Sequence, residues 1–139
     1  MIRMMYRSEN AMTVTGSRLL VHFHDIVATA RRNNEKAEID GFLMFDRTRF
    51  HQILEGPEDQ IDALFAKIKA DPRHTNIEIL SRETITERYF SEWSMGAFLS
   101  ATAVHPLKTR HNMEPNAAVD YETFLRFARD FVVEENADA

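Results

Sequence analysis

The order of strand-like and helical patterns limits the fold of this chain more than any other feature of its sequence. Strand patterns place apolar side chains at every second residue or in short continuous runs, whereas helical patterns repeat every three or four residues. Strand, helix, strand, strand, helix, strand and strand patterns follow one another over residues 2–7, 17–34, 39–45, 50–55, 57–71, 76–84 and 93–100. This order predicts a domain in which helices pack on a sheet.

Local residue types support the boundaries of these elements. Ser17 can cap the first helix, and the asparagine pair at 33–34 ends it. The short polar segment at 46–49 is typical of a hairpin connection between two strands. Pro57 suits the first turn of the second helix, and Pro72 stops that helix.

The first six elements match the split β-α-β order of ferredoxin-like domains, so we expect an α+β fold (βαββαββ) with a five-stranded sheet. In that topology the first and third strands are central neighbours, and both helices lie on one face. The run at 42–45 is apolar on both faces, so both faces of the sheet should be covered. After a loop-like segment at 105–115, the amphipathic pattern at 121–132 predicts a C-terminal helix, which is the expected cover for the second face. We expect a domain over residues 1–100 and a C-terminal loop and helical extension over 101–139.

Composition and charge exclude several classes of function. A length of 139 residues suits one compact domain, and a net charge of −5 without a basic stripe argues against general nucleic-acid binding. No apolar run approaches the roughly 20 residues of a membrane span, so no membrane association is expected. The chain has no cysteine, which excludes disulfides, a thiolate nucleophile and Cys-based metal sites. His22 and His24 would point to nearly opposite sides of a helix, so no metal site is expected. A cytoplasmic protein is the simplest expectation.

The segment Phe50-His51-Gln52-Ile53-Leu54-Glu55-Gly56 carries the most chemical information. Alternation puts Gln52 on the same face as Phe50 and Leu54, so an amide points into an apolar layer. An unsatisfied amide there costs about 1–3 kcal/mol, so Gln52 needs partners. Tyr6, on the expected neighbouring strand, is the nearest predicted phenol, and an amide can bridge a phenol to a heteroaromatic edge. The alternative is that Gln52 bonds only to backbone groups.

Further short motifs precede and follow this segment. In chain order the set is Tyr6-Arg7-Ser8, Asn33-Asn34, Gly41, Phe50 to Gly56, Asp71-Pro72-Arg73-His74 and Trp93-Ser94-Met95. Over roughly residues 1–100 the set resembles the BLUF photoreceptors, which sense blue light with a flavin. The F-x-Q-x-L-E-G and D-x-R-H elements are the most specific part. Asn34 and Gln52 are 18 residues apart, and Gln52 and Asp71 are 19 apart.

The resemblance implies a non-covalently bound oxidised flavin, usually FAD with FMN possible, between the two helices. It implies that Asn34 holds the carbonyl and N3 edge of the flavin ring, with Asn33 assisting. Gln52 would then lie between Tyr6 and the flavin. The remaining residues implied to bind or support the cofactor are Ser8, Asp71, Arg73 and His74.

The light chemistry expected of this site centres on Tyr6 and Gln52. An excited flavin is a strong oxidant, and a nearby phenol can supply an electron and then a proton. Gln52 can pass that proton and return with changed hydrogen bonds. Trp93 and Met95, two residues apart on the last expected strand, resemble the pair implicated in relaying the change. His51 should point away from the flavin, towards the C-terminal helix or a partner.

We expect a light sensor without catalysis. The 39 residues after position 100 are too few for a cyclase or phosphodiesterase. The expected outputs are a change in the C-terminal helix, self-association as a homodimer or higher oligomer, and binding of an unknown downstream protein. Two alternatives are a flavin-dependent oxidoreductase and a ligand-free ferredoxin-like interaction module. Four glycines leave little room for a nicotinamide-binding G-x-G-x-x-G motif, which argues against the oxidoreductase.

Overall fold

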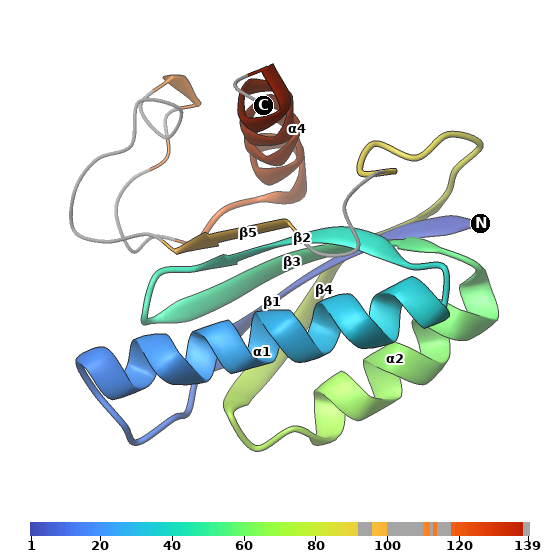
Figure 1. The fold of residues 1–139 in the computed structure, drawn as a ribbon. Helices are drawn as coiled ribbons and strands as arrows, with labels where there is room; N and C mark the ends of the chain where they lie inside the picture. Colours follow the sequence, from blue (N-terminus) through green and yellow to red (C-terminus); the bar gives the residue numbers. More distant parts are fainter. Residues whose placement is uncertain (92–95, 100–109, 112, 114–117, 138–139) are drawn as a thin grey trace.

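The computed structural model describes residues 1–91, 96–99, 110–111, 113 and 118–137. Its strands and helices alternate in the expected order (Figure 1). The elements are β1 (Ile2–Asn10), α1 (Ser17–Lys36), β2 (Asp40–Phe45), β3 (Arg49–Gly56), α2 (Glu58–Ala70), β4 (His74–Thr84), β5 (Gly96–Leu99) and α4 (Tyr121–Ala137). Within the described residues, no helix is both long and apolar enough to cross a membrane.

The strands form one five-stranded sheet in the order β4-β1-β3-β2-β5. β1 and β3 are antiparallel central neighbours, as expected, and β5 joins the sheet parallel to β2. Figure 1 shows α1 and α2 together on one face of the sheet and α4 on the other. The α+β ferredoxin-like prediction is therefore confirmed, including the covering of both faces.

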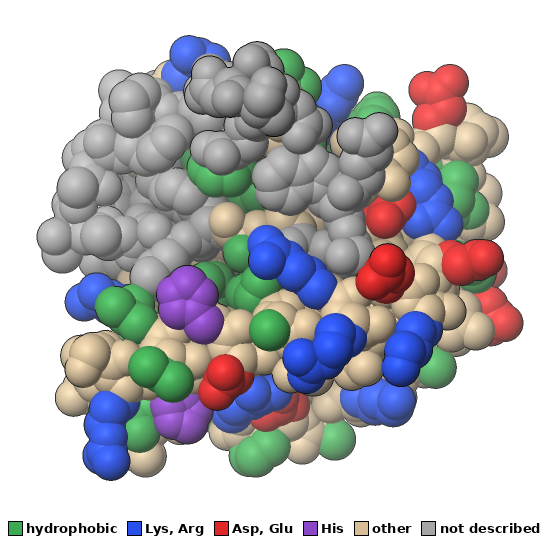
Figure 2. Space-filling model, viewed as in Figure 1, with side chains coloured by type: hydrophobic (Ala, Val, Ile, Leu, Met, Phe, Trp, Pro, Cys, Tyr) green, Lys and Arg blue, Asp and Glu red, His purple; other side chains and the backbone are tan. Residues whose placement is uncertain are grey.

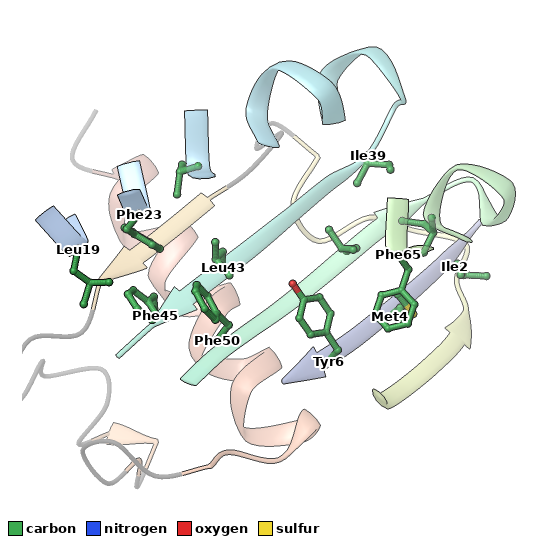
Figure 3. Close-up of a cluster of buried hydrophobic side chains, with 13 residues drawn as sticks. Ile2, Met4, Tyr6, Leu19, Phe23, Ile39, Leu43, Phe45, Phe50 and Phe65 are labelled. Atoms are coloured by element: carbon green, nitrogen blue, oxygen red, sulfur yellow. The ribbon is translucent and has the colours of Figure 1, made fainter. Parts of the chain in front are cut away.

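Two hydrophobic clusters, one on each face of the sheet, make up the core. The first packs β1, β2 and β3 against α1 and α2 and includes Met4, Leu54 and Phe65. Figure 3 shows the Tyr6 ring among the side chains of this cluster. The second cluster packs the opposite face of the strands against α4 and includes Ile53 and Phe124. Because neighbouring residues of β3 point to opposite faces, each central strand contributes to both clusters.

Three boundaries at the N-terminal side differ from the sequence prediction. β1 continues past residue 7 to Asn10, whose N–H donates to the Thr48 carbonyl at 2.9 Å beside the paired β3 strand. Ser17 is the first residue of α1, and Gly16 occupies the cap position without a side-chain cap hydrogen bond. α1 also runs through the asparagine pair to Lys36. Local residue types do not show whether a helix continues past such a pair.

The last two strands also differ from their expected ranges. β4 begins at His74, two residues earlier than expected, because the β1 extension pairs with it there. β5 covers Gly96–Leu99 of the expected 93–100 strand. The rest of that prediction, at 93–95 and 100, lies outside the described residues.

A buried ion pair fastens the second face of the sheet to the connection after β4. Arg3 and Glu55 lie 2.7 Å apart and are almost fully buried. Glu55 also accepts hydrogen bonds from the backbone N–H groups of Tyr89 and Phe90 at 2.9 Å each. The Arg3 guanidinium lies 3.9 Å from the centre of the Tyr89 ring. One carboxylate therefore holds β1, β3 and the segment before β5 together.

Candidate functional site

A pocket of about 190 Å³ lies between α1, α2 and the central strands. Its walls are largely apolar, with contributions from Ile26, Leu43 and Leu64. The sequence-predicted residues that line it come from β1, α1, β3 and the turn after α2. They are Tyr6, Asn33, Asn34, Gln52, Asp71, Arg73 and His74. The fold therefore brings together side chains that are up to 68 positions apart in the sequence.

Tyr6 and Gln52 are directly bonded to each other in this pocket. They are register partners across the β1–β3 ladder, and the Tyr6 hydroxyl donates to Oε1 of Gln52. Both side chains are nearly buried, at 4% and 6% exposed. The Tyr6 ring is packed at 5.7 Å from the Phe65 ring of α2 and 6.2 Å from the His74 ring. The expectation that the two side chains approach each other is confirmed.

The environment of Tyr6 keeps its phenol protonated. Burial raises the pKa of Tyr6 well above its ordinary value, and the negative charge of Asp71 raises it further. A neutral phenol is a hydrogen-bond donor, as the contact with Gln52 requires. Tyr6 is therefore held as a donor with its proton directed at a single amide oxygen.

Asn33 and Asn34 lie near the C-terminal end of α1, where both line the pocket. Asn34 is 2% exposed, whereas Asn33 is exposed at the edge. The Asn34 carbonyl accepts from the Ile39 N–H at 2.9 Å, which bonds this end of the helix to the start of the next strand. This bond holds the backbone at the buried amide.

Asp71 and Arg73 form a closed local unit after α2. The Arg73 Nε atom and backbone N–H both lie 2.9 Å from Asp71 Oδ1. Hydrogen bonding from Arg73 lowers the pKa of Asp71 although partial burial opposes this. The carboxylate therefore orients the turn and offsets much of the Arg73 charge.

His74 is fixed through both ring nitrogens. Nε2 lies 2.6 Å from the Ile68 carbonyl, which can only accept, so Nε2 carries a proton and donates. Nδ1 lies 2.7 Å from the Ser8 hydroxyl. Ser8 is buried and does not line the pocket, so its contact with the site is through His74.

This set of groups fits a flavin ring. The ring offers both carbonyl and N–H groups at one edge, and the pocket presents the amides of Asn33, Asn34 and Gln52, each with donor and acceptor ends. The surrounding apolar side chains suit the ring faces. At about 190 Å³ the pocket is smaller than the roughly 300–1,000 Å³ typical of sites for drug-sized ligands, so a larger molecule would enter it with one end only.

The protein-family comparison agrees with the geometry. A family model described as BLUF, sensors of blue-light using FAD, matches residues 1–96. The chain belongs to the BLUF family. BLUF domains bind flavin, which agrees with the fit between the polar groups of the pocket and the edge of a flavin ring.

Relatives and solved structures support the same family. The photoactivated adenylate cyclase subunit beta of Euglena gracilis is 38% identical over 81 residues, which are 58% of this BLUF chain and 9% of the relative. The chain therefore spans about a tenth of the length of that curated relative. A structure of the BlsA photo-activated state matches with a TM-score of 0.77 and 30% identity, covering 93% of this chain and 92% of that one. Klebsiella pneumoniae BlrP1 with FMN and cyclic diGMP matches with a TM-score of 0.63 and 30% identity, covering 70% and 25%.

Several residues singled out in the sequence of this BLUF chain lie outside the pocket or outside the described residues. Trp93 and Met95 lie outside the described residues, so their relay role stays a prediction. His51 points to the face opposite the pocket, where its ring lies 5.6 Å from the Phe124 ring of α4, as expected. His22 and His24 are both exposed, and no cluster of three or more metal-ligating side chains occurs in the described part of the chain.

Sequence reasoning missed two polar residues of the pocket. Thr29 lies four residues before Asn33 on α1, and Lys67 lies three residues after Leu64 on α2. Residues three or four apart share a helix face, so the spacing from Asn33 and from Leu64 indicates that Thr29 and Lys67 also face the pocket. Neither residue belongs to one of the short motifs noted in the sequence.

Proposed function

We propose that this BLUF chain is a blue-light photoreceptor that binds oxidised flavin non-covalently in the pocket between α1 and α2. The observation that carries the proposal is the buried hydrogen bond from Tyr6 to Gln52 in the wall of that pocket. A phenol beside a ring-sized pocket, bonded to an amide that also lines it, is a donor placed for light-driven chemistry. Tyr6 and Gln52 are thus the proposed photoactive pair.

In this proposal the polar residues of the pocket divide between the ring and its surroundings. Asn34, the buried amide, holds the carbonyl and N3 edge, and Asn33 assists from the rim. Gln52 meets the ring from the side of β3. Arg73 and His74 lie along the ring or the phosphate-bearing chain, while Asp71 orients their turn. Ser8 supports His74 through its hydroxyl.

Positive charge near the pocket favours a phosphorylated flavin. Figure 2 shows Lys and Arg side chains gathered over the C-terminal half of α1, where Arg32 and Lys36 are exposed. Arg32 donates to Thr29 of the pocket wall at 3.4 Å, and Lys67 lines the pocket from α2. We propose FAD as the resident flavin, in line with the description of the family. FMN is the alternative, because the parts that distinguish the two flavins would lie outside the pocket.

The chemistry divides between the ligand and the protein. A bound oxidised flavin would supply the absorption of blue light and, once excited, an acceptor for one electron. Tyr6 gives up an electron and transfers its hydroxyl proton along the existing bond to Gln52 Oε1. The electron and the proton then return to Tyr6 while Gln52 keeps exchanged hydrogen-bond partners, and darkness restores the original arrangement. No substrate is consumed, and the lasting change is the new arrangement of the Gln52 amide.

Sensing is favoured over catalysis because the matched region is the part that this chain shares with relatives of very different architecture. The match covers 92% of BlsA but 9% of the Euglena cyclase subunit. A flavin-dependent oxidoreductase would need a second substrate site beside the ring. A ligand-free ferredoxin-like module would leave the polar side chains of the pocket without a role.

The output is proposed to pass from residues 1–100 to the extension at 101–139. Trp93 and Met95, which precede β5 in the sequence and lie outside the described residues, are the proposed relay to the C-terminal helix or to a partner. The proposed partners are a second copy of the chain, in a homodimer or higher oligomer, and an unidentified downstream protein. A cytoplasmic location is proposed with them.

Flavin binding by matched variants tests the site. Asn34→Ala removes a buried pocket amide, whereas Gln60→Ala removes an exposed amide on α2. Titration of apoprotein with FAD, followed by quenching of flavin fluorescence, should give about tenfold weaker binding for Asn34→Ala. Gln60→Ala should match the wild type. Equal affinity of all three proteins would contradict the assignment of the pocket.

A further inference from the structure

The peptide unit of Val119, just before α4, is bonded to the two central strands. Its N–H donates to Nε2 of His51 on β3 at 3.1 Å in buried surroundings. Its carbonyl accepts a longer hydrogen bond from Nη1 of Arg7 on β1 at 3.5 Å. The Val119 side chain packs into the cluster between the sheet and α4. The start of α4 is therefore attached to the sheet by directional bonds as well as by packing.

The two attachment residues are immediate neighbours of the proposed photoactive pair. Arg7 and His51 are register partners, one position along the ladder from Tyr6 and Gln52. Successive side chains of a strand point to opposite faces. Tyr6 and Gln52 accordingly face the pocket, while Arg7 and His51 contact the residue that precedes α4 on the other side.

The bond to His51 sits next to the first turn of α4. Asp120, the next residue after Val119, accepts from the Thr123 N–H at 2.8 Å and so caps the helix. The His51 ring also lies 5.6 Å from Phe124 in that turn, and His51 is fully buried. In buried surroundings no water can take the place of the acceptor of an N–H group. Any movement of the His51 ring therefore weakens the hydrogen bond of the Val119 N–H.

We propose that His51 is a positioning residue that transmits the light-induced change at Gln52 through the sheet to α4. The inference rests on the proposed function, because it requires Gln52 to change partners in the light. When the Gln52 amide rearranges, the β3 backbone at 51–52 shifts and carries the imidazole on the opposite face with it. The Val119 bond then weakens, and the capped first turn of α4 loosens. This route needs no contribution from the last strand.

Nuclear magnetic resonance on the intact, flavin-loaded wild-type protein tests the relay without any destabilising change. The probes are the Nε2 nitrogen of His51, in histidine-labelled protein, and the amide of Val119. The His51→Gln variant assigns the His51 signal. Both resonances should change under blue light and recover in darkness. Unchanged resonances at both positions, in a sample whose flavin spectrum shifts reversibly, would overturn the proposal.

A pair of variants separates positioning from simple packing. His51→Gln retains an acceptor for the Val119 N–H, whereas His51→Phe fills a similar volume without one. His51 faces away from the pocket, so both variants should keep the reversible red shift. In the dark, His51→Phe should show about tenfold faster hydrogen exchange at the amides of 119–124 than the wild type. His51→Phe should also lose most of the light-induced difference there, and His51→Gln should restore it.

The outcomes distinguish the two levels of the account. A light-induced exchange difference in His51→Phe as large as in the wild type overturns the role of His51 and leaves the photochemistry intact. Absence of any reversible red shift in the wild type overturns the proposed function instead. A red shift in all three proteins, with the exchange difference lost only in His51→Phe, supports the relay.

Discussion

The Tyr6 hydroxyl donates to Oε1 of Gln52 between the two central strands, where the two residues face each other in register. This bond fixes the direction of the Gln52 amide, because only its oxygen can accept from the phenol. The NH₂ group is therefore the end directed away from Tyr6. An exchange of Gln52 partners in the light would start from this one orientation.

We expect Tyr6→Phe to keep bound flavin and to abolish the reversible red shift. The substitution removes the hydroxyl but keeps the ring that packs against Phe65, and loss of its hydrogen bond costs about 1 kcal/mol. Tyr121→Phe is the matched control, because the Tyr121 hydroxyl bonds to Glu83 at 2.5 Å and lies outside the pocket. Absorption spectra before and after blue light check both variants. A full red shift in Tyr6→Phe would show that the phenol is not the donor.

Alkaline pH should destabilise the wild type more than Tyr6→Phe. The pKa of Tyr6 is raised in the folded protein by burial and by Asp71, whereas a phenol in the unfolded chain has a pKa of about 10. The stability from this difference is fully present below about pH 10 and falls as pH rises, by up to ~1.4 kcal/mol per pH unit. Urea unfolding at about pH 9, 10 and 11 measures the two slopes. Parallel slopes for the two proteins would rule out the raised pKa.

Glu55→Ala should lower the free energy of unfolding by about 3–5 kcal/mol. The change leaves the buried Arg3 charge without its nearest carboxylate and removes the acceptor for two backbone N–H groups. Glu122→Ala is the control, since Glu122 forms an exposed pair with Arg126 at 3.7 Å and should change stability by less than about 1 kcal/mol. Urea unfolding measures both. Similar small losses would mean that the Arg3–Glu55 pair does not hold the sheet.

Gly41→Ala should be more destabilising than Gly56→Ala. A Cβ at position 41 would lie 2.3 Å from the Ile53 backbone carbonyl oxygen, so β2 and β3 would have to separate. At position 56 the nearest atom, the Glu38 carbonyl oxygen, would be 3.0 Å away. We expect a loss of about 1–3 kcal/mol for Gly41→Ala and a smaller loss for Gly56→Ala. The midpoints of urea unfolding decide the order, and the reverse order would contradict the close strand contact.

The pairing of the two central strands, and the faces on which Gln52 and His51 lie, were predictable from the sequence. The split β-α-β order placed Tyr6 and Gln52 on adjacent strands. Period-two alternation put Gln52 on the face covered by the first two helices and His51 on the opposite face. These features depend on topology and strand geometry, which hydrophobic patterns report directly. The structure confirms all three.

Other features depend on contacts that no local pattern records. Ser17 has a good capping side chain, yet the turn before it puts Gly16 at the cap position, with φ of 62°. Ser8 was expected to support the cofactor site without a specified partner, and its bond to His74 becomes visible only in the folded structure. The bond between His51 and Val119 joins residues 68 positions apart, so it requires the packing of α4 on the sheet.

The light-minus-dark absorption spectrum of purified wild-type protein, recorded beside Gln52→Leu, tests the central claim most directly. Gln52→Leu keeps an apolar side chain of similar size in the pocket and removes the amide that Tyr6 bonds to. The wild type should be yellow, shift its flavin absorption to the red under blue light and recover in darkness. Gln52→Leu should bind flavin and show no such shift. A colourless wild type, bleaching without a shifted oxidised spectrum, or a normal photocycle in Gln52→Leu would contradict a Tyr6–Gln52 photosensor.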